Sequence, residues 1–162
     1  MNMNINSLSQ KYSVRKLDEN DVYIIYDMSC KNDIFYQYHP PFVTRKSILD
    51  DMGALPPGKG YDDKFYVGFF ENDSLVGLMD LILDYPEKEI SFIGLFMTDT
   101  RYQNRDVGSG IISDVILCLK SSGYKEIRLG VDKGNPQSYS FWTKNKFTPI
   151  REDTYILMGL RI

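Results

Sequence analysis

The chain has 162 residues, of which 43% are hydrophobic, 25% charged and 14% aromatic. Length and composition together predict a single domain, residues 1–162, that can bury an apolar core without stabilising disulfide bonds or metal ions. The formal net charge of −3 argues against nucleic acid as a main partner, because phosphate binding needs concentrated positive charge, and favours a cationic or neutral small substrate.

The first part of the chain predicts a strand followed by two helices. Residues 12–17 alternate apolar and polar side chains as a short strand does, and Asp18 is a typical N-cap for a helix whose apolar stripe reaches Met28. A second helix is expected after Thr44. It must end near residues 55–60, LPPGKG, because paired prolines and glycines break regular structure.

Three strands are predicted in the middle of the chain. Residues 64–70 and 74–85 are rich in aromatic and branched side chains, and they flank the turn residues 71–74, so we expect an antiparallel hairpin. Residues 89–97, EISFIGLFM, carry apolar side chains on both faces, which is typical of a central strand covered on both sides.

Helices and strands alternate in the remaining part. Apolar residues recur at helical spacing before Gly123, which supplies a C-terminal stop, and Asn135 followed by Pro136 is a typical cap and first-turn pair. We expect a helix over 111–123, a strand over 125–132, a helix over 136–145 and a closing strand over 154–162.

The cysteine, histidine and hydropathy patterns argue against several classes of protein and of functional site. Cys30 and Cys118 are the only cysteines, which is no disulfide framework and favours a reducing cytoplasm. They lack metal-ligand spacing, and the single histidine, His39, precedes two prolines as an exposed loop residue would, so we expect no metal site and no Ser-His-Asp triad. The first residues do not resemble a signal peptide, and no apolar run is long enough to span a membrane, so we expect a cytoplasmic protein without a membrane partner.

The stretch RYQNRDVGSGIISDV, residues 101–115, places glycines and arginines where a helix is about to begin. The first turn of a helix has unpaired backbone N–H groups and a partial positive charge. A glycine-containing loop lets an anion approach those groups closely, which makes a phosphate site. An ordinary turn before a helix produces the same short pattern, so this stretch alone does not decide between the two.

Two motifs carry a resemblance to a known family. The stretch above is similar to a pyrophosphate-binding motif, Q/R-x-x-G-x-G/A, and GNPQSYSFWTKNKF, residues 134–147, is similar to a later pattern, N-x-x-[AS]-x-x-F-[YW]-x-K-x-x-F. Together, and in this order, they make the chain resemble the GNAT superfamily of N-acetyltransferases over nearly its whole length. The resemblance implies an α+β fold in three layers, α/β/α, with a mixed, mostly antiparallel central sheet and helices on both faces.

The resemblance also implies a reaction and a binding site. The reaction is transfer of an acetyl group from acetyl-CoA, as cosubstrate and without a metal, to a primary amine of a small molecule or peptide. The thioester is expected along a splay between two strands, about residues 95–98 and 129–133. The residues expected to hold acetyl-CoA are Phe96, Met97, Thr98, Gln103, Asn104, Arg105, Asp106, Val107, Gly108, Ser109, Gly110 and Asn135.

The register of the first motif is open between two alignments. The flanking residues favour Gln103, Asp106 and Gly108 as the signature positions, which puts an aspartate where glycine is usual. A shift by two gives Arg105, Gly108 and Gly110, a complete match to the pattern. In both alignments the backbone amides of about residues 103–110 would surround the pyrophosphate, and we call this loop the amide cradle. Arg105 either adds a bond to phosphate or is a solvated loop residue.

The chain departs from the family at both positions that resemble its catalytic residues. Many relatives carry a glutamate in the middle of the fourth strand as general base, and this chain has Gly94 and Leu95 there. Asp80 and Glu89 are the candidate substitutes, and each is equally well explained as a solvated carboxylate at a strand end. The tyrosine that serves many relatives as general acid is replaced by Trp142, so Tyr139 is the candidate acid, with packing in the core as its other explanation.

These departures leave two further hypotheses beside the enzyme. One is a non-catalytic acyl-CoA sensor that keeps the fold. The other is a nucleotide-binding enzyme, which the antiparallel hairpin before the loop disfavours because dinucleotide folds start with a parallel βαβ unit. The acceptor is not identified: residues 26–64 are expected to shape its pocket, with the aromatic residues Tyr36, Tyr38, Phe42 and Tyr61 either lining it or packing. A homodimer stays open as well.

Overall fold

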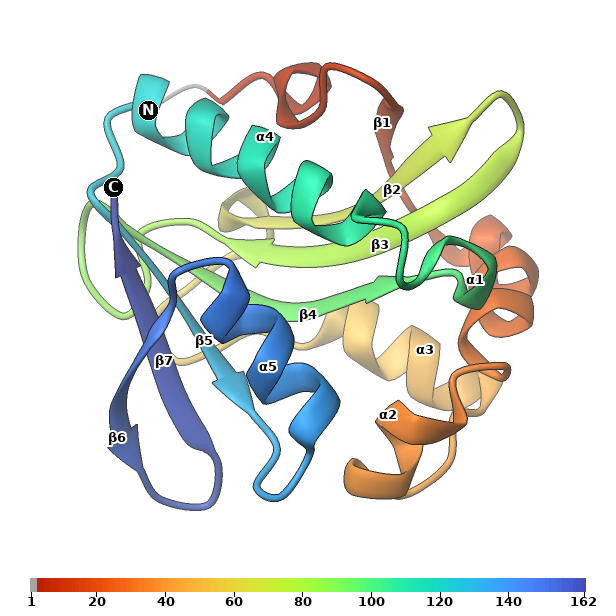
Figure 1. Cartoon of the computed structure of the whole chain (residues 1–162). Coiled ribbons are helices and arrows are strands. Elements are labelled where there is room, and N and C mark those ends of the chain that lie inside the picture. Colours follow the sequence, from red (N-terminus) through yellow and green to blue (C-terminus); the bar gives the residue numbers. More distant parts are fainter. Residues whose placement is uncertain (1–2) are drawn as a thin grey trace.

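A computed structural model describes residues 3–162. The strands within these residues form one seven-stranded sheet in the order β1-β2-β3-β4-β5-β7-β6 (Figure 1). Only β4 and β5 run parallel; every other neighbouring pair among the described residues is antiparallel. The strands are β1 (Ser13–Lys16), β2 (Lys64–Glu71), β3 (Ser74–Ile82), β4 (Ile90–Thr98), β5 (Glu126–Val131), β6 (Thr148–Glu152) and β7 (Ile156–Arg161).

Helices cover both faces of this sheet, α4 and α5 on one and α1 and α3 on the other (Figure 1). Local sequence sets their ends. Thr44 caps α3 through its side chain, and Asn135 caps α5, with Pro136 in the first turn. The helices are α1 (Val22–Ser29), α2 (Asp33–Tyr38), α3 (Arg45–Gly53), α4 (Val107–Ser121) and α5 (Pro136–Lys144).

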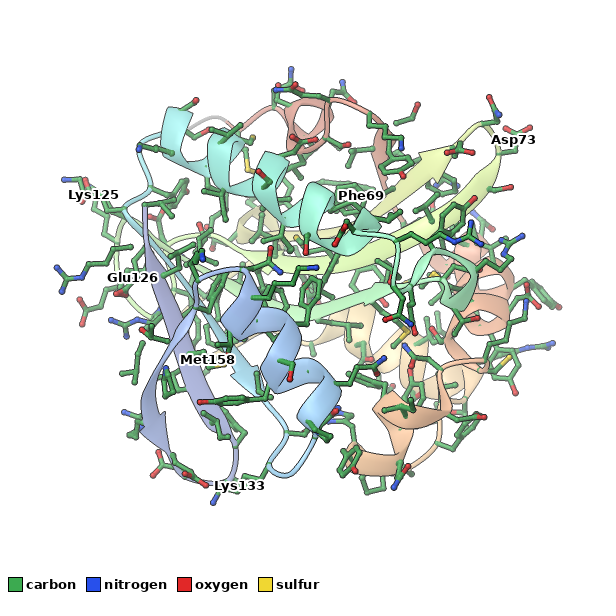
Figure 2. All side chains as sticks on the ribbon, viewed as in Figure 1. Phe69, Asp73, Lys125, Glu126, Lys133 and Met158 are labelled. Atoms are coloured by element: carbon green, nitrogen blue, oxygen red, sulfur yellow. The ribbon has the colours of Figure 1, made fainter. Side chains whose placement is uncertain are left out.

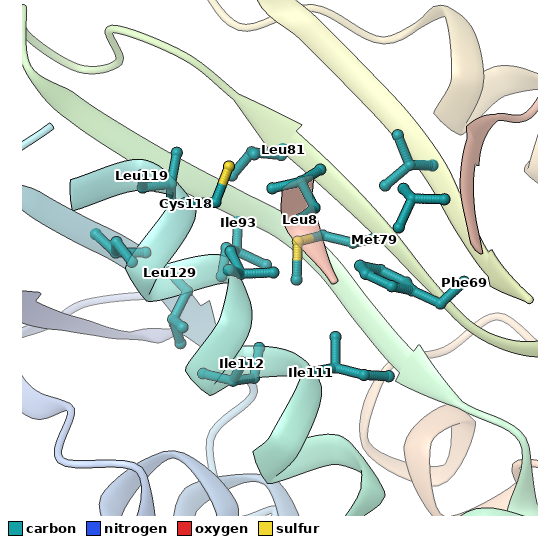
Figure 3. Packing of buried hydrophobic residues seen from close by; sticks show 14 of the residues in the cluster. Leu8, Phe69, Met79, Leu81, Ile93, Ile111, Ile112, Cys118, Leu119 and Leu129 are labelled. Carbon is teal, nitrogen blue, oxygen red and sulfur yellow. The ribbon is translucent and has the colours of Figure 1, made fainter. Parts of the chain in front are cut away.

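Two apolar clusters, one on each face, hold the layers together. The larger lies between α4 and the sheet and contains the fully buried Phe69 and Ile111 (Figure 3). The smaller joins α1 and α3 to the opposite face through residues such as Ile25 and Leu78. Charged side chains such as Asp73, Lys125 and Lys133 project at the periphery (Figure 2). The expected α+β fold, with helices on both faces of a mostly antiparallel sheet, is confirmed.

Most expected elements are present, and two were missed. The hairpin of β2 and β3 turns at residues 71–74 as predicted, with Asn72 at a φ of 54°. The helix α2 was not predicted, because its six residues are too few to show a helical period. The strand β6 was missed because all five of its residues are exposed and one is Pro149, which is tolerated at a sheet edge.

The sheet opens between its two parallel strands. β4 pairs with β5 only from Ile90↔Glu126 to Ile93↔Leu129, and beyond this point the two strands separate. On the other side of β4, the register with β3 skips one residue at Gly94, because Asp80 faces Leu95 and Leu81 faces Ile93. We call the gap that begins at Gly94 the β4–β5 opening. It lies where the splay was expected.

Candidate active site

A cavity of about 490 Å³ lies between the end of β4, the start of α4 and the side of α5. We call it the loop cavity, because the loop after β4 forms one wall. It gathers nine of the residues predicted to hold acetyl-CoA. They are Phe96, Met97, Thr98, Gln103, Asn104, Asp106, Val107, Gly108 and Ser109.

The backbone of the loop distinguishes the two alignments of the motif. Asp106 has a φ of 60° and stands directly before the first residue of α4, in the left-handed conformation that glycine adopts most easily. Gly108 and Gly110, by contrast, lie inside α4. The structure therefore favours the alignment that places Asp106 at the usual glycine position.

Gly108 also lets α5 approach the start of α4. A Cβ atom built on Gly108 would lie 3.0 Å from Cε1 of Phe141, whereas one on Gly110 would meet nothing within 4 Å. The Asn145 side-chain amide donates to the Ser109 hydroxyl at 3.1 Å, and Lys144 pairs with Asp106 at 2.6 Å. The second motif thus packs directly on the first.

Three predicted cofactor residues stand outside the lining of the loop cavity: Arg105, Gly110 and Asn135. Arg105 is an exposed loop residue. Asn135 is 2% exposed and acts on α5, where its side-chain oxygen accepts from the Ser138 backbone N–H at 3.2 Å. Its side-chain nitrogen donates to the Ser138 hydroxyl at 3.1 Å, which leaves the hydroxyl proton of Ser138 free to be donated elsewhere.

A second cavity of about 440 Å³ lies on the other side of the β4–β5 opening. We call it the strand cavity, because β4 and β5 form its floor. It is bounded further by α2, α3 and Tyr155. The two cavities share the lining residues Phe35, Phe96, Ser138 and Trp142. They therefore meet at the opening, with Phe96 between them.

Asp80 faces the strand cavity from β3 and lies against the β4 glycine. A Cβ atom on Gly94 would be 3.2 Å from its Oδ2 atom, so the aspartate fills the space that a side chain at position 94 would need. The same oxygen accepts from Lys64 Nζ at 2.8 Å. Oδ1 is buried and has no hydrogen-bond partner among residues 3–162. Burial raises the pKa of this carboxyl group, and the Lys64 ammonium opposes the rise.

Two further carboxylates line the strand cavity. Asp51, on α3, forms no ion pair within residues 3–162, and burial raises its pKa while Lys64 and His39 lower it. Asp132, after β5, lies 3.0 Å from Nδ1 of His39. The lining within the described residues therefore has three aspartates and no lysine or arginine, although Asp80 is paired with Lys64 and Asp132 with His39, which also lines the cavity.

The comparisons with known proteins agree with this architecture. A sequence model of the acetyltransferase (GNAT) family matches residues 23–147, well over half of the chain. The chain belongs to the GNAT family of acetyltransferases. The family and the class of enzyme expected from the two motifs are thereby confirmed. A comparison with curated proteins finds no match.

Three solved acetyltransferase structures illustrate the likeness of fold. An acetyltransferase from Thermus thermophilus is 17% identical, with a TM-score of 0.80, 94% of this chain covered and 97% of the other. PaiA N-acetyltransferase from Thermoplasma acidophilum, in complex with coenzyme A, is 18% identical, with a TM-score of 0.71 and coverages of 93% and 98%. The ribosomal-protein-S18-alanine N-acetyltransferase from Escherichia coli is 15% identical, with a TM-score of 0.66 and 93% of both chains covered.

Of the three candidate catalytic residues, only Asp80 lies at a cavity of this GNAT fold. Glu89 stands just before β4, at the opposite end from the opening, and the five residue steps from Glu89 to Gly94 span roughly 17 Å of extended chain. Its carboxylate lies 3.3 Å from Lys125 Nζ. Tyr139 is 37% exposed on α5 and belongs to neither cavity lining, so the expected alternative of core packing does not describe it either.

The sequence-based prediction did not single out two polar residues of the site. Ser138 was quoted within the second motif but given no role, although its hydroxyl group lies at the junction of the cavities. Lys64 was assigned to a strand, and nothing in its neighbours indicates that its ammonium group is buried against Asp80. Of the four aromatic residues considered for the acceptor pocket, Tyr36 alone lines the strand cavity.

The remaining expectations concern metals and membranes. No group of His, Cys, Asp and Glu side chains within residues 3–162 is arranged to hold a metal ion. In the same residues, no helix is both long and apolar enough to cross a bilayer.

Proposed function

We propose that this GNAT protein transfers an acetyl group from acetyl-CoA to a primary amine of a small molecule or peptide. The observation that carries the proposal is the meeting of the two cavities at the β4–β5 opening. A thioester in the loop cavity and an amine in the strand cavity would face one another across Phe96. We further propose that residues 1–162 act as one domain, in the cytoplasm.

The loop cavity suits the anionic part of coenzyme A. α4 begins at Val107, its first three residues line the cavity, and a helix N-terminus has unpaired backbone N–H groups and a partial positive charge. Gly108 lets Phe141 of α5 close one wall of this site, since a Cβ atom there would lie 3.0 Å from Cε1 of Phe141. The β4 residues beyond Gly94 have no strand partner on the β5 side, so their backbone groups are available to a pantetheine arm. The coenzyme A complex of the Thermoplasma protein, which shares the fold, supports this assignment.

Asp80 is the proposed base. Acetyl-CoA, when bound, supplies the acetyl group as a thioester. An amine that enters as an ammonium ion must first lose a proton, and the Asp80 carboxylate in the strand cavity can accept it. The amine nitrogen then bonds to the acetyl carbon as the carbon–sulfur bond breaks. The nitrogen loses its second proton in the same step, and this proton can pass to the leaving thiolate to give the free thiol. Ser138 can donate a hydrogen bond from its hydroxyl group to that sulfur, a role that Tyr139 is not placed to fill.

The acidic lining of the strand cavity favours a positively charged acceptor. Asp51, Asp80 and Asp132 face it, and an acceptor with its own carboxylate would be repelled. The aromatic walls suit the apolar part of such an amine. We therefore expect an alkyl amine or diamine to be a better acceptor than a free amino acid.

The second candidate is a non-catalytic acyl-CoA sensor. Gly94 and Trp142, which replace the glutamate and tyrosine of many relatives, are the observations that favour it. Both candidates require acetyl-CoA binding, but only the enzyme releases a thiol.

Two measurements test the proposal. In a thermal-shift titration, acetyl-CoA at about a hundredfold excess over its Kd should stabilise the protein by about 2.7 kcal/mol. For a chain of this length that corresponds to a rise in Tm of about 5–10 °C. Thiol release is then followed with a panel of amines. No shift at millimolar coenzyme A contradicts both candidates, while binding without any thiol release leaves only the sensor.

A further inference from the structure

We propose that Lys64 is a positioning residue that keeps Asp80 ionised and turned toward the strand cavity. The inference rests on the proposed function, in which Asp80 is the base. In effect, a carboxylate and ammonium pair on β2 and β3 takes the place of the glutamate missing from β4.

The pair is buried and its geometry is close. The side chain of Lys64 is 4% exposed and that of Asp80 is 14% exposed, and Nζ lies 2.8 Å from Oδ2. Their strands are neighbours, with Tyr66 of β2 directly opposite Asp80 and Lys64 opposite Ile82. A buried lysine is rare unless it has a partner, so this contact fixes both side chains.

The contact also fixes which oxygen faces Gly94. Lys64 holds Oδ2, and Oδ2 is the atom nearest to the empty Cβ position of Gly94. Gly94 is an exposed residue at the β4–β5 opening. A carboxylate without this anchor could rotate about its side-chain bonds, and burial would favour its protonated form. The anchored form presents a negatively charged oxygen to an amine at the opening.

Other charged and titratable groups lie near this carboxylate or line the same cavity. Asp51 approaches from α3 and raises the pKa of Asp80. Tyr66, on β2, has its pKa raised by burial, by Asp51 and by Asp80, so it stays neutral. Tyr36, on α2, is likewise kept neutral, chiefly because burial raises its pKa. Lys64 is therefore the group among them that lowers the pKa of Asp80, through its hydrogen bond and its charge.

The test is a titration of Asp80 by carbon NMR, with aspartate labelled at the carboxyl carbon and the signal assigned by its loss in Asp80→Asn. In Lys64→Met the pKa of Asp80 should rise above that of the unsubstituted protein. The acid limb of the rate–pH profile should move in the same direction, so that turnover at mildly acidic pH falls by about tenfold or more and recovers at alkaline pH. A lysine that merely supports the fold would lower Tm without moving either curve.

Folding stability gives a further sign. In Lys64→Met the folded-state pKa of Asp80 lies further above its unfolded value. The folded state then binds more protons, and stability should fall as pH rises through that window. Lys64→Arg keeps the charge and should restore the ionised Asp80. The matched control is Lys59→Met, which removes a nearby ammonium paired with Asp63 at 3.4 Å and should change neither curve.

The outcomes separate the inference from the proposed function. An Asp80 titration that is unmoved in folded Lys64→Met overturns the inference, even if the enzyme is active. A protein that acetylates nothing overturns the proposed function, even if the titration moves. Should Lys64→Met fail to fold, Lys64→Gln is titrated in its place. The unsubstituted protein is also decisive, since an Asp80 found protonated at neutral pH contradicts the role of Lys64.

Discussion

The two cavities are built in different ways. More than half of the residues that line the loop cavity come from one stretch of chain, residues 96–109, which includes the start of α4. The strand cavity brings together side chains from α2, α3, β3, β4 and β5. The first therefore depends mainly on the local conformation of one segment, and the second on side chains that only the folded sheet and its helices bring together.

The largest expected effect comes from replacing Asp80, the proposed base in the strand cavity. Asp80→Asn should lower turnover by roughly a hundredfold or more at neutral pH, because the acceptor amine is then mostly protonated and has no base. Affinity for acetyl-CoA should stay nearly unchanged, since Asp80 does not line the loop cavity. Thiol release and coenzyme A binding are measured over a pH series. The lost rate should recover as pH rises, because alkaline solvent supplies free amine.

Two control variants sharpen this result. Glu89→Gln and Tyr139→Phe remove the other candidate groups, which lie outside both cavities, and each should keep nearly full activity. Full activity of Asp80→Asn at neutral pH would mean that the amine loses its proton to solvent. In the unsubstituted protein, burial raises the pKa of Asp80, so activity should be lost on acidification above the ordinary range of an aspartate.

The next effect concerns the loop cavity. Gly108→Val should weaken coenzyme A binding by about tenfold to a hundredfold, because the overpacked side chain would force Phe141 and the start of α4 apart at the cavity wall. The new side chain would meet the Phe141 ring, 3.0 Å from its Cβ, and fill the space beside the α4 amides. Binding is measured by calorimetry, with circular dichroism to check the fold.

Gly110→Ala is the matched control for this loop. It adds a Cβ atom within the same helix, where no atom lies within 4 Å, and should raise stability slightly while leaving binding intact. Equal loss of affinity in both variants would show that the start of α4 as a whole is disturbed. Normal coenzyme A binding by Gly108→Val would contradict the assignment of this loop as the phosphate-binding site.

The contrast between the cavities also explains which features of the fold and the site could be predicted from the sequence. The cap at Asn135 and the hairpin at 71–74 are local patterns, and each was predicted in place. The motif around Gln103 and Gly108 was correctly placed before a helix, but that helix begins at Val107 and not at Ile111, so Gly108 lies inside the helix and not in the loop. Even Asp106, which stands where glycine is usual, has a local explanation, because aspartate tolerates the positive φ of 60° that the backbone adopts there.

The strand cavity could not be read in the same way. Asp80 and Lys64 are sixteen residues apart, and only the register of β2 with β3 brings their side chains together. Glu89 and Asp80 were equal candidates in sequence because a strand has two ends, and the pattern does not show which end faces an opening. The position of the splay followed from the family resemblance rather than from the residues.

A moderate effect is expected at the edge of the strand cavity. Asp51→Asn should raise KM for a diamine by about threefold to tenfold with little change in kcat, because a screened carboxylate steers and binds the cation without taking part in the reaction. The change should shrink at high salt. Asp50→Asn is the control, since Asp50 is a neighbour on α3 that pairs with Lys46 and lies outside the cavity. An equal rise in both variants would assign the effect to general surface charge.

The smallest effect lies in the loop cavity, at its one unfavourable charge. Lys144 lowers the pKa of Asp106, so this carboxylate is ionised beside the proposed pyrophosphate position. Asp106→Asn keeps a residue that tolerates a φ of 60° but removes the charge, and it frees the Lys144 ammonium for the phosphate. Affinity for coenzyme A should rise about twofold to fivefold, and more at low ionic strength. Lys144→Met should act in the opposite direction. If Asp106→Asn instead weakens binding, then Asp106 is held there by more than its backbone conformation, and the pyrophosphate does not lie against it.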